Sequence, residues 1–84
     1  MKELLINFYC PSTSKSYDFW VPKTMAAESV LAQVCEDICA LEGREVFTER
    51  DALVLCSYLS GKTLPMSSTL EQEGIKSGDR LAVV

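Results

Sequence analysis

Histidine is absent from this sequence of 84 residues. Imidazole is the commonest general base near neutral pH, the commonest zinc ligand and the usual partner of a catalytic serine or cysteine. Basic residues are also scarce relative to acidic ones, so the formal net charge is −4. A phosphate backbone or an anionic lipid surface repels such a chain on average, which argues against binding to nucleic acid or to membranes.

Long apolar runs are missing as well. No stretch approaches the roughly 18 consecutive apolar residues of a membrane-spanning helix. The apolar run from Leu4 to Tyr9 is too short for the core of a signal peptide, and a mixed charge pair precedes it. The sequence contains no internal repeat, linker or low-complexity segment. We therefore expect one domain over residues 1–84, in the cytoplasm and without insertion into a membrane.

The cysteines offer the only candidate nucleophiles or metal ligands of note. There are four of them: Cys10, Cys35, Cys39 and Cys56. Without an export signal, free thiols in a reducing compartment are favoured over disulfides. Cys35 and Cys39 share one face of a predicted helix, but a zinc site would also need the two isolated cysteines. The acidic residues that follow Cys35 disfavour a thiolate. We predict no metal site, no cofactor and no enzymatic activity.

Two segments near the start of the sequence alternate between apolar and polar positions. Residues 3–9 place Leu4, Ile6 and Phe8 on one face of a strand. Residues 17–21 alternate in the same way until Pro22, which cannot donate to a central ladder. A short polar turn separates the two runs. This arrangement predicts an antiparallel hairpin.

Residues 25–41 change to a helical period. The apolar residues that share one face are Val30, Leu31, Val34, Cys35, Ile38 and Leu41. Thr24 is the predicted N-cap, and Gly43 is a stop signal just beyond the last periodic residue. The sequence therefore predicts one amphipathic helix after the hairpin.

The rest of the sequence predicts shorter elements. A charged connection, 43–51, leads to a mostly apolar strand, 52–59, whose composition is typical of a central strand. Residues 64–65 fit a short edge segment, and 70–73 a single helical turn capped from 67–69. A last strand begins at Arg80. We expect an α+β domain, with one main helix packed on one face of a mixed four- to five-stranded sheet. Its first and last strands run parallel in the middle.

Four short segments carry a family resemblance: Gly61-Lys62-Thr63-Leu64, Thr69-Leu70, Gly74-Ile75 and Gly78-Asp79-Arg80-Leu81. They resemble the matching part of β-grasp, or ubiquitin-like, domains. The wording Gly-Ile-x-x-Gly-Asp-Arg-Leu is closer to the bacterial YukD-like proteins and the related domains of type VII (WXG-type) secretion. The run from Tyr17 to Pro22, leading into Val30-Leu31, is similar to that group too.

The resemblance implies a function by binding. Conjugated modifiers and sulfur carriers need a flexible diglycine tail, whereas this sequence stops at Val84 inside a predicted strand. We therefore expect a non-conjugated ubiquitin-like protein-binding module. The YukD-like resemblance implies a cytosolic accessory or regulatory component of type VII secretion. The alternative is a small ubiquitin-like structural subunit of a multicomponent enzyme such as a monooxygenase.

Trp20 and Tyr58 are the predicted protein-binding residues. By strict alternation, each falls on the strand face opposite the larger apolar set. When a helix covers one face of a sheet, aromatic side chains on the other face are frequent interface anchors. The alternatives are that they cap the edge of the core, or that the register is shifted by one residue, which would exchange the faces.

Overall fold

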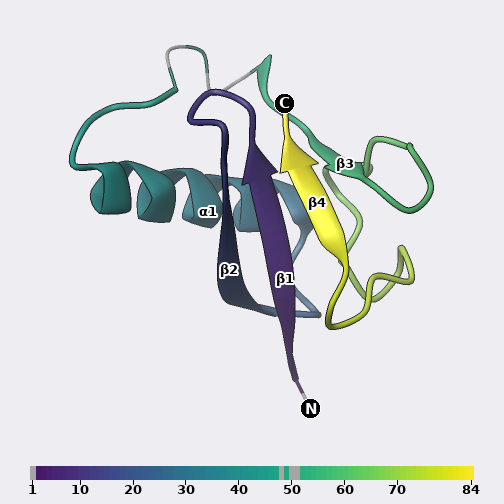
Figure 1. Cartoon of the computed structure of the whole chain (residues 1–84). Helices are drawn as coiled ribbons and strands as arrows, with labels where there is room; N and C mark the ends of the chain where they lie inside the picture. The colour runs from purple at the N-terminus through teal and green to yellow at the C-terminus, as the bar shows by residue number, and fades with distance from the viewer. Residues whose placement is uncertain (1, 48, 50–51) are drawn as a thin grey trace.

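The computed structural model describes residues 2–47, 49 and 52–84. Its helix and strands, in chain order, are β1 (Glu3–Cys10), β2 (Lys15–Pro22), α1 (Ala27–Glu42), β3 (Leu55–Ser57) and β4 (Arg80–Val83). The strands form one sheet in the order β2-β1-β4-β3, with β1 and β4 parallel and the other pairs antiparallel. Figure 1 shows α1 across one face of this sheet. The predicted mixed sheet, with its first and last strands adjacent, is confirmed.

The hairpin of β1 and β2 is regular over its whole length. Its register runs from Glu3 opposite Pro22 to Cys10 opposite Lys15. The side chains that face α1 are buried or half-buried: Leu4, Ile6, Phe8, Tyr17, Phe19 and Val21. Both predicted strands are confirmed, and each extends by one or two residues at its ends. The predicted alternation therefore assigns the two faces of the hairpin correctly.

The start of α1 differs from the prediction. The helix begins at Ala27, and the residue before it forms no side-chain capping hydrogen bond, so Thr24 is not the N-cap. Instead, two carbonyls from a distant segment accept the first free amides of the helix. Ala27 N donates to Ser68 O at 2.8 Å, and Glu28 N donates to Met66 O at 3.0 Å. A tertiary contact thus supplies what a capping side chain would otherwise provide.

The end of α1 follows the sequence signal. Gly43 adopts the left-handed conformation, with φ of 69°, and the amide of Arg44 donates to the carbonyl of Cys39 at 3.2 Å. The predicted apolar stripe is buried except for Leu41, which is 66% exposed. Within the described residues, no helix has the length and apolar character needed to cross a bilayer.

The third strand is shorter than predicted and lies elsewhere in the sheet. β3 covers three residues of the predicted range 52–59, and it occupies the end of the sheet rather than its centre. Two backbone hydrogen bonds join it to the turn that follows: Ser57 N to Lys62 O at 2.9 Å, and Leu64 N to Leu55 O at 2.8 Å. The turn also pairs with β3 through one isolated antiparallel bridge, Cys56 opposite Thr63, next to the predicted edge segment 64–65. Part of the predicted connection 43–51 lies outside the described residues.

The predicted helical turn at 70–73 is a series of hydrogen-bonded turns rather than a helix. Thr69 and Gln72 form a reciprocal pair at its start. The Thr69 amide donates to Gln72 Oε1 at 2.9 Å, and the Gln72 amide donates to Thr69 Oγ1 at 3.1 Å. Leu70, which follows Thr69 in the chain, is fully buried. The segment therefore closes one end of the core without a regular element.

A polar cluster joins β2 to the end of α1. Glu42 Oε1 accepts from Lys15 Nζ at 3.2 Å, and Glu42 Oε2 accepts from the Tyr17 hydroxyl at 3.0 Å. These two bonds, that from Lys15 foremost, hold the pKa of the Glu42 carboxyl below its ordinary value of 4.5. Partial burial raises the pKa of the Tyr17 hydroxyl above its ordinary value of 10.0. The cluster therefore favours an ionised Glu42 and a neutral Tyr17.

Replacing Glu42 by glutamine should reduce the dependence of stability on acid pH. A carboxyl whose pKa is lower in the folded state contributes stability above its unfolded pKa. That contribution is lost as pH falls through the folded pKa, which here lies below 4.5. Urea unfolding at pH 7 and pH 3 should show a smaller difference between the two conditions for Glu42→Gln than for the unmodified chain. Glu28→Gln, at an exposed site, is the control. Equal pH dependence in all three proteins would contradict the lowered pKa of Glu42 in the folded state.

Candidate functional site

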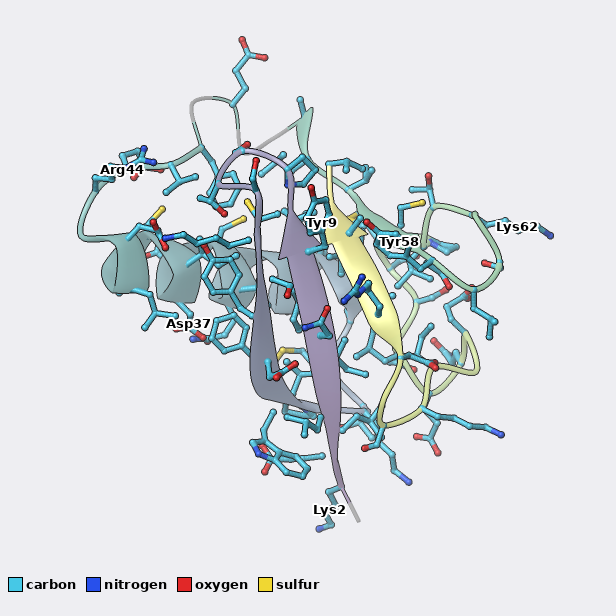
Figure 2. The ribbon with its side chains drawn as sticks, viewed as in Figure 1. Lys2, Tyr9, Asp37, Arg44, Tyr58 and Lys62 are labelled. Carbon is cyan, nitrogen blue, oxygen red and sulfur yellow. The ribbon has the colours of Figure 1, made fainter. Side chains whose placement is uncertain are left out.

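One face of the sheet is left uncovered by α1, and we call it the open face. It carries Leu5, Asn7 and Tyr9 of β1, Asp18 and Trp20 of β2, Arg80 and Ala82 of β4, and Tyr58 directly after β3. In Figure 2, Tyr9 and Tyr58 lie together over this face, on the side of the sheet away from α1. The open face is therefore the place where the structure brings the predicted site residues.

Trp20 occupies the open face of the edge strand β2. It stands directly opposite Leu5 in the register of the hairpin. Its side chain is 55% exposed, and that of Leu5 is 36% exposed. A half-exposed indole beside an exposed leucine forms a small apolar surface at this end of the sheet. The predicted placement of Trp20 on the face opposite the core is confirmed.

Tyr58 occupies the other side of the open face. β3 ends at the preceding residue, but the backbone still bonds to β4 because Tyr58 N donates to Arg80 O at 3.2 Å. The Tyr58 ring meets the Tyr9 ring edge to face at 6.2 Å between centroids, and the Arg80 guanidinium lies 5.5 Å from its centroid. The side chain is still 51% exposed. It is an exposed aromatic surface with a cation against one face.

A row of polar side chains crosses the open face between these two aromatic sites. Asn7 stands opposite Asp18 of β2 and Arg80 of β4 in the two registers. Its amide nitrogen donates to Asp18 Oδ1 at 3.0 Å, and its amide oxygen accepts from Arg80 Nε at 2.7 Å. One amide thus links an acid and a base on neighbouring strands. We call these three side chains, Asp18, Asn7 and Arg80, the Asn7 row. The Asn7 row holds Arg80 in its position beside Tyr58.

The open face therefore has two aromatic sites rather than one. Trp20 lies level with Leu5, whereas Tyr58 contacts Tyr9, and the Asn7 row separates them. The structure thus places both predicted residues on one face without bringing them into contact. Alternation along residues 3–9 already indicated that Leu5 and Tyr9 share this face. The contribution of Arg80 depends on strand order, which alternation does not reveal.

The cysteines occupy structural positions. Cys10 and Cys35 are buried in the core, and Cys39 and Cys56 are half-buried. Cys39 lies beside the core, where its sulfur accepts from the Val46 amide at 3.5 Å. Across residues 2–47, 49 and 52–84, no three side chains of the metal-binding types gather into one site. The burial of Cys35 agrees with its predicted place on the apolar stripe of the helix.

A cleft of about 500 Å³ lies on the helix side of the molecule. Its walls are mainly apolar side chains of α1, Leu53, Val54 and Met66, together with the carboxylates of Glu28 and Glu36. Cys35 lies among them, but its side chain is 1% exposed. Among the described lining residues there is no lysine or arginine that would favour a thiolate.

No family model matches this sequence, and no curated protein matches it. Solved structures do match in fold. The ubiquitin-like domain of EccD5 from Mycobacterium xenopi has a TM-score of 0.79 and 11% identity, covering 100% of this chain and 94% of that one. The ubiquitin-like domain of the type VII secretion protein EccD1 of Mycobacterium tuberculosis has a TM-score of 0.77 and 14% identity, covering 100% and 99%.

A ubiquitin from Caldiarchaeum subterraneum is similar as well, with a TM-score of 0.71, 20% identity, and 96% of this chain and 90% of that chain covered. At such identities the likeness concerns the fold. The domain has the ubiquitin-like β-grasp fold, with one helix on a mixed four-stranded sheet. The predicted fold class is confirmed.

Proposed function

We propose that this domain is a non-covalent protein-binding module that docks through its open face. The observation that carries the proposal is the pair of half-exposed aromatic side chains, Trp20 and Tyr58, on the face of the sheet that α1 leaves uncovered. Tryptophan, tyrosine and arginine are the residue types most enriched among energetically dominant interface contacts. All three occur on this face, with Arg80 against the Tyr58 ring.

The rigidity of the open face supports the same function. The Asn7 row bonds β2, β1 and β4 to one another through side chains, in addition to the backbone ladders. A surface that is already ordered loses less side-chain entropy when a partner binds. Trp20 and Tyr58 then act as two separate anchors at opposite sides of a preformed surface. Binding through two such sites favours an extended partner surface over a small ligand.

For the biological context, we propose an accessory or regulatory role in type VII secretion, exerted in the cytoplasm. Two observations support it: the wording of residues 74–81 resembles YukD-like proteins, and ubiquitin-like domains of EccD proteins match along the whole chain in fold. In this role the domain acts by binding rather than by catalysis. A membrane component of the secretion apparatus is the proposed class of partner.

Alanine substitution of the two anchors tests the proposal. We expect Trp20→Ala and Tyr58→Ala each to weaken partner binding by about 30-fold, the effect of losing a typical dominant contact of about 2 kcal/mol. The measurement is affinity capture from cells that express the protein, with captured proteins identified by mass spectrometry. The affinity of the purified partner is then measured.

Leu41→Ala is the matched control, because Leu41 is a large exposed apolar side chain on α1 rather than on the open face. It should leave binding unchanged, and thermal unfolding should show that all three variants are folded. Loss of binding in Leu41→Ala, with binding retained by the anchor variants, would place the interface on α1. Capture of a diiron hydroxylase instead of a secretion component would support the enzyme-subunit alternative.

A further inference from the structure

β2 forms one edge of the sheet along its whole length. It pairs with β1 on one side, and no other described strand pairs with it on the opposite side. Figure 1 shows this free edge, with α1 passing behind it rather than beside it. The strand has 8 residues, more than twice the length of β3 at the other edge. A long edge strand presents a row of backbone groups to which another strand can pair.

The hydrogen-bond register shows which backbone groups point outward. Just beyond the hairpin register, Lys23 N donates to Lys2 O at 2.9 Å, so these two residues form a hydrogen-bonded pair. Such pairs recur at every second position of an antiparallel ladder. The inward-bonded residues of β2 are therefore Lys15, Tyr17, Phe19 and Val21. The amides and carbonyls of Ser16, Asp18 and Trp20 point away from the sheet.

These three outward-pointing residues are all exposed. This series of outward-pointing backbone groups is bounded by the turn residue Ser14, with φ of 57°, and by Pro22, which has no amide hydrogen. Outward groups recur every second residue, at a spacing of about 6.8 Å. An extended backbone carries donors and acceptors at that same spacing, whereas a helix satisfies its own groups internally. The edge therefore matches another strand.

Charge along the edge limits which strand fits. The lysine that begins β2 and the lysine that follows it each have an acidic partner: Lys15 lies 3.2 Å from Glu42, and Lys23 lies 3.8 Å from Glu71. Asp18, in the middle of the row, has an amide partner, Asn7, rather than a cation. The centre of the edge is therefore negatively charged. An incoming strand with a lysine or arginine opposite Asp18 would form a favourable cross-strand pair.

A second copy of this chain is a poor occupant. Antiparallel pairing of β2 with β2, using all three outward residues, sets Ser16 opposite Trp20 and Asp18 opposite Asp18. Like charges directly opposite one another destabilise a sheet. A shift by two residues in one direction brings in Pro22, which has no amide hydrogen, and in the other it brings in Ser14, which is not extended. Asp18 thus protects the edge against self-association while attracting a basic strand.

We infer that the free edge of β2 binds an extended segment of a partner protein by strand addition, with a basic side chain of that segment opposite Asp18. The inference rests on the proposed protein-binding function, but it uses backbone groups at the edge rather than side chains of the open face. The added strand would lie beside Trp20 and would widen the open face by one strand. The partner would therefore contribute an extended segment with at least one basic side chain.

A synthetic peptide tests this inference directly. The probe is acetyl-Lys-Val-Lys-Val-Lys-Val-amide, which places its lysines on one face of a strand. Titrated into the ¹⁵N-labelled domain, it should shift the amide signals of residues 16–20 in a saturable manner. It should also slow hydrogen exchange at Ser16, Asp18 and Trp20. Absence of saturable shifts would overturn the inference, as would shifts confined to Tyr9 and Tyr58.

Two controls separate strand addition from attraction between opposite charges. The same peptide with an N-methyl group on every amide keeps its charge and side chains but has no amide hydrogen to donate from either edge, and it should not bind. Ser16→Pro removes one outward amide and should weaken binding of the probe by about fivefold, whereas Ser16→Ala should not. Proline is tolerated on an edge strand where its amide would face solvent. Equal binding of both peptides would overturn the inference.

Asp18→Asn tests the role assigned to the charge. It should weaken binding of the lysine peptide by about two- to fivefold and raise self-association in sedimentation velocity. Asp37→Asn, which makes the same charge change on α1, should do neither. Unchanged peptide affinity in Asp18→Asn would remove the basic residue from the inference. The capture experiment tests the side chains of Trp20 and Tyr58, whereas this titration tests the backbone amides at the edge of β2. Docking through the open face and strand addition at the edge can therefore be refuted independently of each other.

Discussion

Replacing Phe8 by alanine should lower the free energy of unfolding by about 3–5 kcal/mol, the usual cost of removing a buried aromatic ring. Phe8 lies in the middle of β1, is fully buried and packs against Phe19 with ring centroids 6.0 Å apart. β1 is itself paired on both sides, so the surrounding backbone has little freedom to close the cavity. Urea unfolding followed by circular dichroism measures the loss. In a domain of this size, it approaches the total stability.

Tyr9→Ala is the matched control for this substitution. Tyr9 is the next residue of the same strand, but its side chain lies on the open face and contacts Tyr58. Its removal should cost about 1 kcal/mol, because the ring is partly exposed and leaves no internal cavity. If the two variants lost equal stability, the assignment of the two faces of β1 would be wrong.

Leu70→Ala should lower the free energy of unfolding by about 2–5 kcal/mol, although Leu70 belongs to no helix or strand. Its side chain is fully buried in the same core as Phe8 and Leu81. The surrounding segment also bonds to α1, since its carbonyls accept the first amides of that helix. Urea unfolding measures the cost, and hydrogen exchange should show the largest local loss of protection at the start of α1.

Glu71→Ala is the control for Leu70→Ala. Glu71 is the next residue, is exposed and has one ion pair, with Lys23 at 3.8 Å. An exposed pair of this kind contributes about 0–1 kcal/mol, so the substitution should change stability little. A small effect of Leu70→Ala, comparable to that of Glu71→Ala, would show that the segment is a surface loop rather than part of the core.

The elements that could be predicted from the sequence are those with local causes. Alternation in β1 and β2 follows from burial of one face. It therefore predicted both strands and which of their side chains face the core. The helix ends just before Gly43 because the chain at this residue adopts a left-handed conformation, which glycine accommodates without the steric cost of a Cβ atom. In each case, the residues that determine the element lie within it or next to it.

The elements that were predicted wrongly have distant causes. The start of α1 depends on carbonyls of Met66 and Ser68, about forty positions further along the chain, so the nearby Thr24 was a misleading signal. The position of β3 depends on β4, and an apolar run looks the same whether its strand lies at the centre or the edge of a sheet. Neither of these long-range contacts can be predicted from a local sequence pattern.

The candidate site was partly predictable for the same reason. Alternation placed Trp20 on the open face, and the structure places Tyr58 there as well. Their separation by the Asn7 row could not be predicted, because it requires the strand order and two registers. The free edge of β2 likewise follows from strand order alone.

The bond between Asn7 and Arg80 joins residues that are 73 positions apart in the sequence. β4 stands between β1 and β3, so β3 cannot join the sheet until residues 80–83 arrive. During synthesis on the ribosome, the hairpin and α1 emerge long before that closing strand. Contacts of such high sequence separation form late and slowly, because the loop between them must be ordered first. The nascent chain therefore keeps one side of β1 unpaired until nearly all of the domain has been made, and its assembly ends in the middle of the sheet.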